Sequence, residues 1–128
     1  MATLIPADAQ VLAGVELGGV PLVVALSAAT GPPAAFLRRA TKRYGSKRQI
    51  EGAAIERRRV VLVDDVVRSG GQLTVMARIL RKAGAEVTDA LCALERPLGG
   101  RRLLEEHIMT LQALLHERDF PHETGAAS

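Results

Sequence analysis

The sequence predicts an α/β fold, a parallel β-sheet with helices on both faces. Short apolar runs alternate along the chain with segments of helical length and spacing, as in repeated strand–helix–strand units. The runs are continuous stretches of Val, Leu and Ala, which is typical of strands covered on both faces. Charged residues follow four of these runs. Because ligands bind at the carboxyl ends of the strands in such folds, this distribution favours a binding site there.

Each predicted element is bounded by residues that start or stop regular structure. Pro21 suits the first turn of a helix, and Gly31 with the two prolines after it ends that helix. Gly84 is a natural C-cap for a later helix. We expect one domain over residues 1–128, with a weakly structured tail at 116–128. The expected strands are 10–15, 34–37, 59–64, 87–94 and 110–115, and the expected helices are 18–29, 71–83 and 101–106.

The composition excludes several classes of protein. A chain of 128 residues suits one domain with its own core. Cys92 is the only cysteine, so neither an intrachain disulfide nor a cysteine-rich metal site is possible, and we expect it in the core. The aromatic residues are only Tyr44, Phe36 and Phe120, too few for nucleic-acid binding by base stacking. The histidines have no metal-like spacing, so we expect surface residues and no protein-only metal site at His107, His116 and His122.

The sequence lacks signals for export or membrane insertion. The N-terminus has no basic start followed by an apolar stretch. The longest uncharged run, residues 17–37, is interrupted by glycines and three prolines. We therefore expect a soluble, cytoplasmic protein.

Positive charge is concentrated in one segment. The net charge is +3, from 17 basic and 14 acidic residues. This segment is either a solvated basic loop or a site for an anion such as phosphate, diphosphate or nucleic acid. It contains no acidic residue, and its cations are Arg38, Arg39, Lys42, Arg43, Lys47 and Arg48.

Residues 60–73 carry the strongest functional signal. An apolar run ends in Asp64-Asp65, and a short loop with Ser69, Gly70 and Gly71 leads into a helix. Backbone N–H groups of such a loop, with the positive end of a helix behind them, can hold a phosphate. The two carboxylates can accept hydrogen bonds from sugar hydroxyls or lie near a divalent metal. The alternative is that they only cap the loop.

This segment resembles the 5-phosphoribosyl diphosphate (PRPP) binding motif of type I phosphoribosyltransferases. Three other stretches are similar to bacterial orotate phosphoribosyltransferases, so that the resemblance runs from about residue 11 to residue 115. Residues 14–22 resemble the diphosphate loop, although Gly18-Gly19 is also compatible with a simple helix start. Residues 38–45 resemble the mobile catalytic loop, and 94–96 resemble the Leu-Asp-Arg of the family. A surface ion pair between Glu95 and Arg96 is the alternative for the last stretch.

The resemblance implies that orotate and PRPP are converted to orotidine 5′-monophosphate and diphosphate with Mg²⁺, by a homodimer that binds neither nucleic acid nor membrane. Lys42 and Asp65 are then the catalytic residues. Arg38, Arg39, Lys42 and Tyr44 would contact the diphosphate, Asp64 and Asp65 the ribose hydroxyls, Ser69, Gly70, Gly71 and Gln72 the 5-phosphate, and Arg96 the orotate carboxylate. The PRPP site also includes Val66, Val67 and Arg68, and Arg68 would border the orotate.

Two departures from the family pattern leave a second interpretation open. Arg68 stands where the family usually has Thr, and only about ten residues precede the first matched strand, so we expect a chain shortened at its N-terminus. The alternative function is a non-catalytic PRPP- or nucleotide-binding relative that has lost base recognition. A basic nucleic-acid-binding module is less compatible with the few aromatic residues.

Overall fold

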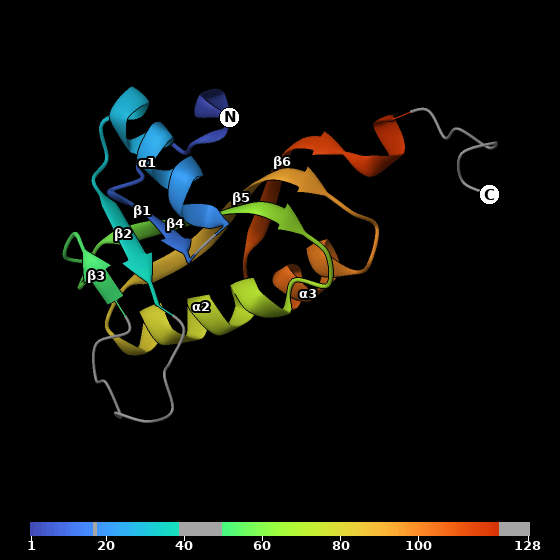
Figure 1. The fold of residues 1–128 in the computed structure, drawn as a ribbon. Coiled ribbons are helices and arrows are strands. Elements are labelled where there is room, and N and C mark those ends of the chain that lie inside the picture. Colours follow the sequence, from blue (N-terminus) through green and yellow to red (C-terminus); the bar gives the residue numbers. More distant parts are fainter. Residues whose placement is uncertain (17, 39–49, 121–128) are drawn as a thin grey trace.

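Six strands form a single sheet that is mainly parallel (Figure 1). A computed structural model describes residues 1–16, 18–38 and 50–120. The strand order is β3-β2-β1-β4-β5-β6, in which β3 is antiparallel to β2 and all other neighbours are parallel. The predicted fold class is therefore confirmed. The strands are β1 (Val11–Val15), β2 (Ala34–Leu37), β3 (Ile50–Gly52), β4 (Arg59–Val67), β5 (Glu86–Glu95) and β6 (Thr110–His116).

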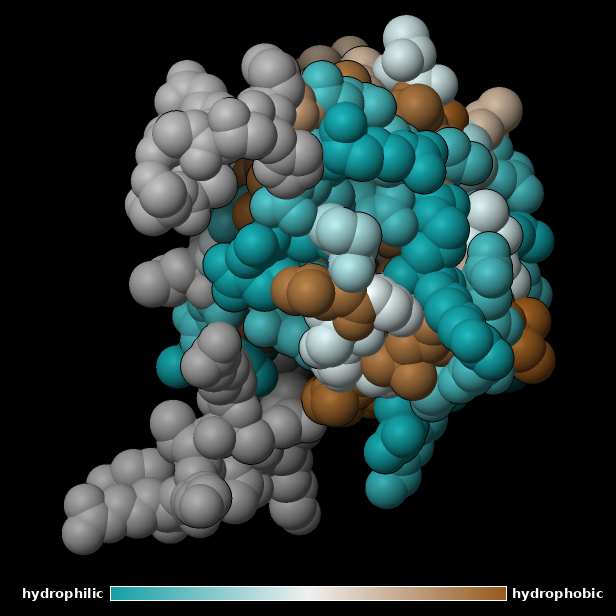
Figure 2. Space-filling model, turned by 90° about the vertical axis from the view of Figure 1, so that its right-hand side faces the viewer, coloured by the Kyte–Doolittle hydropathy of each residue, from teal (hydrophilic) through white to brown (hydrophobic). Residues whose placement is uncertain are grey.

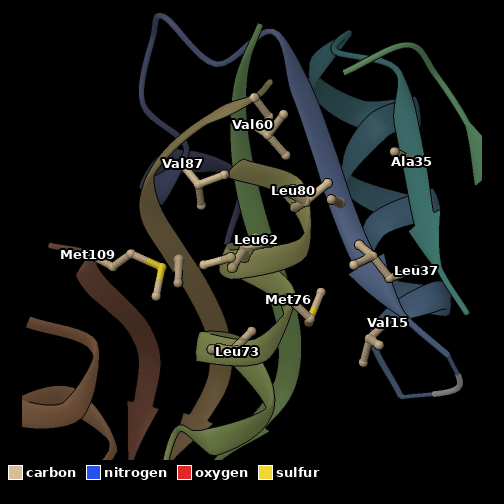
Figure 3. Packing of buried hydrophobic residues seen from close by; sticks show 14 of the residues in the cluster. Val15, Ala35, Leu37, Val60, Leu62, Leu73, Met76, Leu80, Val87 and Met109 are labelled. Atoms are coloured by element: carbon tan, nitrogen blue, oxygen red, sulfur yellow. The ribbon is translucent and has the colours of Figure 1, made fainter. Parts of the chain in front are cut away.

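Helices cover both faces of the sheet. Helix α1 (Gly19–Thr30) lies on one face, and α2 (Gly71–Lys82) and α3 (Gly100–Glu106) lie on the other (Figure 1). Each face of the sheet packs against its helices through a separate hydrophobic cluster, and alternate residues of the central strand β4 belong to different clusters. Val61 and Val63 pack with α1, whereas Val60 and Leu62 pack with α2. The larger cluster places Leu62 next to the apolar side of α2 (Figure 3).

Core packing explains why α2 forms. Leu73, Met76, Ala77 and Leu80 recur at helical spacing and are all buried. Cys92 is also fully buried in the α2 cluster, as predicted for a small core residue. The helix ends in Arg81 and Lys82, whose positive charges suit the negative end of the helix dipole.

The central strand is longer than predicted. We expected a strand at 59–64 that ends at the first of the two aspartates, but β4 continues to Val67 and contains both Asp64 and Asp65. The reason is continued pairing with β5, which extends as far as Val67↔Glu95. Pairing with β1 stops earlier, at Gly14↔Val63. From Asp64 onward β4 pairs with a strand on one side only, and we call the side without a strand partner its open side.

Smaller differences lie at the edges of the sheet. Strand β3 was not predicted, because three residues carry no recognisable periodicity. The expected tail begins with the last residue of β6, His116, followed by a 3-10 turn, η2 (Glu117–Asp119). Another short turn, η1 (Ala2–Leu4), precedes β1. Within the ranges that the structure describes, no helix is long and apolar enough to span a bilayer.

Candidate functional site

A hollow of about 170 Å³ lies where β4 ends and α2 begins. In Figure 1, β4, β5 and β6 all end on this side of the sheet, the position expected for a ligand site in such folds. Figure 2 faces this side and shows hydrophilic side chains around a small hydrophobic group. The hollow brings together most of the residues that the sequence assigned to PRPP: it is lined by Asp64, Val66, Val67, Arg68, Ser69, Gly70, Gly71, Gln72 and Leu73.

The start of α2 gives this hollow hydrogen-bond donors. The first N–H groups of a helix have no intrahelical acceptor, and the N-cap residue of α2, Gly70, has no side chain that could accept from them. Gly70 precedes the helix at φ +80°, a left-handed conformation that glycine adopts without strain. Ser69 Oγ accepts a long hydrogen bond of 3.4 Å from the Gly71 N–H. A phosphate in the hollow would meet these N–H groups and the positive end of the helix dipole.

A close backbone contact holds the loop against α3. A Cβ atom on Gly100, the first residue of α3, would lie 2.5 Å from the Arg68 carbonyl oxygen, 2.6 Å from Val67 Cγ1 and 3.2 Å from Gly70 N. A Cβ on Gly70 would in turn lie 3.0 Å from the Gly100 carbonyl oxygen. Only glycine permits this approach from the α3 side, so the position of the loop depends on the residue type at 100.

The two aspartates of β4 differ in their surroundings. Asp64 is 6% exposed, whereas Asp65 is exposed. Asp64 Oδ1 accepts a hydrogen bond from the Asp65 N–H, and Asp65 Oδ1 accepts one from the Val66 N–H, both at 2.8 Å. Asp65 also lies beside the start of α1, because a Cβ on Gly18 would be 2.8 Å from Asp65 Oδ2. The stretch with Gly18 and the aspartates is therefore assembled at the open side of β4.

These surroundings shift the pKa values of the two carboxyl groups in opposite directions. Burial raises the pKa of Asp64 to about 7, and the adjacent Asp65 side chain contributes in the same direction. The hydrogen bond with Asp64 lowers the pKa of Asp65 below its usual range. Near neutral pH, Asp65 therefore carries a full negative charge while Asp64 is partly protonated.

The raised pKa of Asp64 makes stability depend on pH. Above the ordinary carboxyl pKa of 3.8 and up to about pH 7, folded Asp64 holds a proton that the unfolded chain has lost. The free energy of unfolding therefore falls as the pH rises through this window. Asp64→Asn should remove this contribution and raise the Tm at pH 8 by about 3–8 °C. Thermal unfolding from pH 4 to pH 8 measures it, with Asp8→Asn as the control at an exposed carboxylate. An Asp64→Asn variant with the same pH slope as the parent would contradict the expectation.

The segment after β5 is joined to the end of β4 by a backbone hydrogen bond. The Arg96 N–H donates to the Val67 carbonyl oxygen at 2.9 Å. The Arg96 side chain does not pair with Glu95, the alternative raised from the sequence. Its Nε donates to Glu117 Oε1 at 3.1 Å.

Glu95 instead belongs to a cluster that sequence reasoning missed. Arg101 donates to both carboxylate oxygens of Glu95 at 2.7 and 3.0 Å, and it also donates to the Leu111 carbonyl oxygen. These hydrogen bonds lower the pKa of Glu95. His116, which we expected on the surface, is partly buried with Nδ1 at 3.0 Å from Glu95 Oε1. The pairing Glu95↔His116 in neighbouring strands creates this contact. A second hollow, of about 500 Å³, is lined by Glu95, Pro97, Arg101, His116, Glu117 and Arg118.

The basic segment is only partly within the described structure. Arg38 forms an exposed ion pair with Glu51 at 2.8 Å, at the edge of the sheet. Arg39, Lys42 and Tyr44 lie outside the described residues. Within the described ranges, no three His, Cys, Asp or Glu side chains are grouped to hold a metal ion. Arg68 is exposed, and after the hydrogen bond from Asp64 its charge is a further cause of the lowered pKa of Asp65.

Comparison with known proteins shows the family of the chain. The family model described as phosphoribosyl transferase domain matches residues 3–116. Orotate phosphoribosyltransferase of Nocardioides sp. is 38% identical over 98% of this chain and 72% of its own length. Orotate phosphoribosyltransferase of Methanopyrus kandleri is 41% identical over 88% of this chain, which spans 61% of that relative. The crystal structure of orotate phosphoribosyltransferase from Aeropyrum pernix superposes with a TM-score of 0.81 at 29% identity, covering 88% of this chain and 63% of that one. The chain therefore belongs to the phosphoribosyltransferase family.

Proposed function

We propose that this protein is an orotate phosphoribosyltransferase, which converts orotate and PRPP to orotidine 5′-monophosphate and diphosphate. The main support is the hollow at the start of α2, where Asp64 and a glycine-containing loop adjoin a helix N-terminus. Asp65, the next residue of β4, does not line this hollow and lies beside Gly18. The relatives named orotate phosphoribosyltransferase support orotate as the acceptor.

The described residues suggest a role for each part of the site. The loop and first turn of α2 would bind the 5-phosphate through N–H groups. Asp65, exposed and charged, would accept hydrogen bonds from the ribose hydroxyls. Arg96 would bind the orotate carboxylate, since a planar guanidinium matches that group. Its backbone hydrogen bond to Val67 would keep the base side and the phosphate side at a constant separation.

The chemical step is departure of diphosphate from the ribose. Positive charge then develops on the sugar ring and negative charge on the leaving diphosphate. Donors already aimed at the diphosphate would stabilise that charge, and we assign this role to the cations of segment 38–48, with Lys42 as the catalytic lysine. Asp65 would hold the ribose in place while the bond breaks.

We also propose that Mg²⁺ participates. Magnesium is usually held by one or two carboxylates together with substrate phosphates, so a complete protein cage is unnecessary. Asp65 fits this use, because it is exposed and its pKa lies below the usual range. The ion would neutralise part of the diphosphate charge when bound. We also propose a homodimer, because the resemblance of residues 38–45 to the family's mobile catalytic loop implies a loop that reaches the site of the neighbouring subunit. A cytoplasmic location is proposed from the sequence, in which we found no signal for export.

The test is a comparison of turnover with binding. Orotate consumption is followed by absorbance with PRPP and Mg²⁺, and PRPP binding to the same protein is measured by calorimetry. Turnover supports the proposed enzyme. PRPP binding without turnover supports the second candidate, a non-catalytic PRPP- or nucleotide-binding protein. The specific observation in its favour is the exposed Arg68 at the lining of the hollow.

Replacing Arg68 by Thr separates obstruction of the base from attraction of phosphate. We expect Arg68→Thr to increase orotate turnover or orotate affinity severalfold, because a long cation leaves the edge of the site while Ser69, Gly70 and Gly71 remain. Affinity for PRPP should change little. Both ligands are measured at two ionic strengths. A loss of PRPP affinity that shrinks with added salt would contradict obstruction and assign Arg68 to phosphate binding.

A further inference from the structure

The ion pair between Arg96 and Glu117 places a carboxylate of the chain on the guanidinium assigned to the substrate carboxylate. The Arg96 Nε to Glu117 Oε1 distance is 3.1 Å, and the side chains are 40% and 33% exposed. Both partners are therefore accessible to a ligand. Glu117 also lines the hollow of about 500 Å³ at this side of the sheet.

The fold positions this pair from both sides. The Arg96 backbone is held by its hydrogen bond to Val67, at the end of β4. Glu117 immediately follows β6, whose last residue, His116, is in register with Glu95, the last residue of β5. The residues after these two strand ends, 96 and 117, therefore meet. Turn η2 keeps Glu117 near the strand end through a hydrogen bond from the Phe120 N–H to the Glu117 carbonyl oxygen.

The other carboxylate near Arg96 is that of Glu95, which is paired with Arg101. Glu95 accepts two hydrogen bonds from Arg101 and lies 3.0 Å from His116 Nδ1. Among the described residues, the recorded ion pair of Arg96 is with Glu117. The charge of Glu117 therefore acts on the same cation that a carboxylate ligand would use.

We propose that Glu117 is an internal competitor that limits the affinity of Arg96 for a carboxylate-bearing pyrimidine. This inference rests on the proposed function, in which Arg96 binds the orotate carboxylate. A ligand carboxylate must either displace Glu117 from Nε or bind at the remaining Nη donors. In both cases it meets a second negative charge a few ångströms away. Removing that charge while keeping an oxygen acceptor for Arg96 should strengthen binding of the anionic ligand.

The decisive variant is Glu117→Gln, which retains the side-chain oxygen and the length of the side chain. We expect the KM for orotate and its calorimetric Kd to fall roughly three- to tenfold at low ionic strength, with a smaller change at high salt. Affinity for PRPP should stay at the parent value. Uracil, which has the pyrimidine ring without the carboxylate, should bind the parent and the variant equally.

A matched control is Glu106→Gln, which removes the same charge from an exposed ion pair with Arg102. It should leave orotate binding unchanged. The ion pair of Glu117 with Arg96 is partly exposed and contributes little to stability, so the Tm of Glu117→Gln should remain close to that of the parent.

The outcomes separate this inference from the proposed function. If the parent consumes orotate and Glu117→Gln has an unchanged or higher KM for it, the competitor role is wrong while the function stands. Equal gains for orotate and uracil would also overturn the inference, because the effect would not involve the carboxylate. If neither protein binds or consumes orotate, the proposed function fails and the inference fails with it.

Discussion

Asp65→Asn should weaken PRPP binding about tenfold to a hundredfold. Asp65 is exposed at the open side of β4, and the hydrogen bond with Asp64 holds its pKa below the usual range. It therefore presents a full negative charge and only acceptor atoms to ribose hydroxyls. An amide loses the charge and presents donors as well, and a charge-assisted hydrogen bond is worth roughly 1.5–3 kcal/mol. Calorimetric titration with PRPP measures the change.

The control is the same substitution at the opposite end of the sheet. Asp8 precedes β1 and pairs with Arg59, the first residue of β4, at 3.0 Å. Asp8→Asn should bind PRPP as the parent does. Equal affinities of the parent and a folded Asp65→Asn variant would exclude Asp65 from the ribose site.

Gly100→Ala should weaken PRPP binding by about tenfold or more and reduce stability by roughly 1–3 kcal/mol. The new methyl group would stand 2.5 Å from the Arg68 carbonyl oxygen and 2.6 Å from Val67 Cγ1, so backbone has to move. The loop that moves is the one proposed to bind the 5-phosphate. PRPP calorimetry and thermal unfolding, performed on the same preparation, measure both effects.

Gly99→Ala distinguishes displacement of the loop from general strain. Gly99 has φ +90°, which disfavours alanine, but a Cβ there would meet nothing within 4 Å. This variant should lose stability and keep its affinity for PRPP. If Gly100→Ala also keeps that affinity, the contact between Gly70 and Gly100 does not position the phosphate loop.

Local patterns were sufficient for most of the fold and for the loop between β4 and α2, which we propose binds the 5-phosphate. The apolar run before Asp64, the glycines of the loop and the helical spacing after Gly71 are contiguous in sequence, and each has a local physical meaning. For this reason most of the segment that the sequence singled out lies together around the smaller hollow, although Asp65 is not part of its lining. The predicted length of β4 was wrong because the strand continues to pair with β5 after its pairing with β1 has ended.

The surroundings of Arg96, where we propose that the base binds, depended on information that is not local. The register of β5 and β6 decides whether Arg96 pairs with Glu95 or with Glu117. These two strands are separated in the sequence but are neighbours in the sheet. Arg101 was interpreted as the start of a short helix, yet its side chain reaches back to Glu95. The sequence does show acidic and basic residues near the ends of β5 and β6. Without the register of the two strands, it does not indicate which acidic residue pairs with which basic residue.

The early end of β1 has a consequence for local opening of β4. Up to Val63, β4 lies between two strands, and releasing its amides requires disruption of the sheet. Beyond that point, the amides of Asp65 and Val66 donate to side-chain carboxylates. Residues 64–67 of β4 can therefore open locally at a lower free energy than residues 59–63, without global unfolding of the protein. A ligand that binds the same carboxylates should slow hydrogen exchange of the amides at residues 64–67. The amides at residues 59–63 should keep exchange rates that are determined by global unfolding.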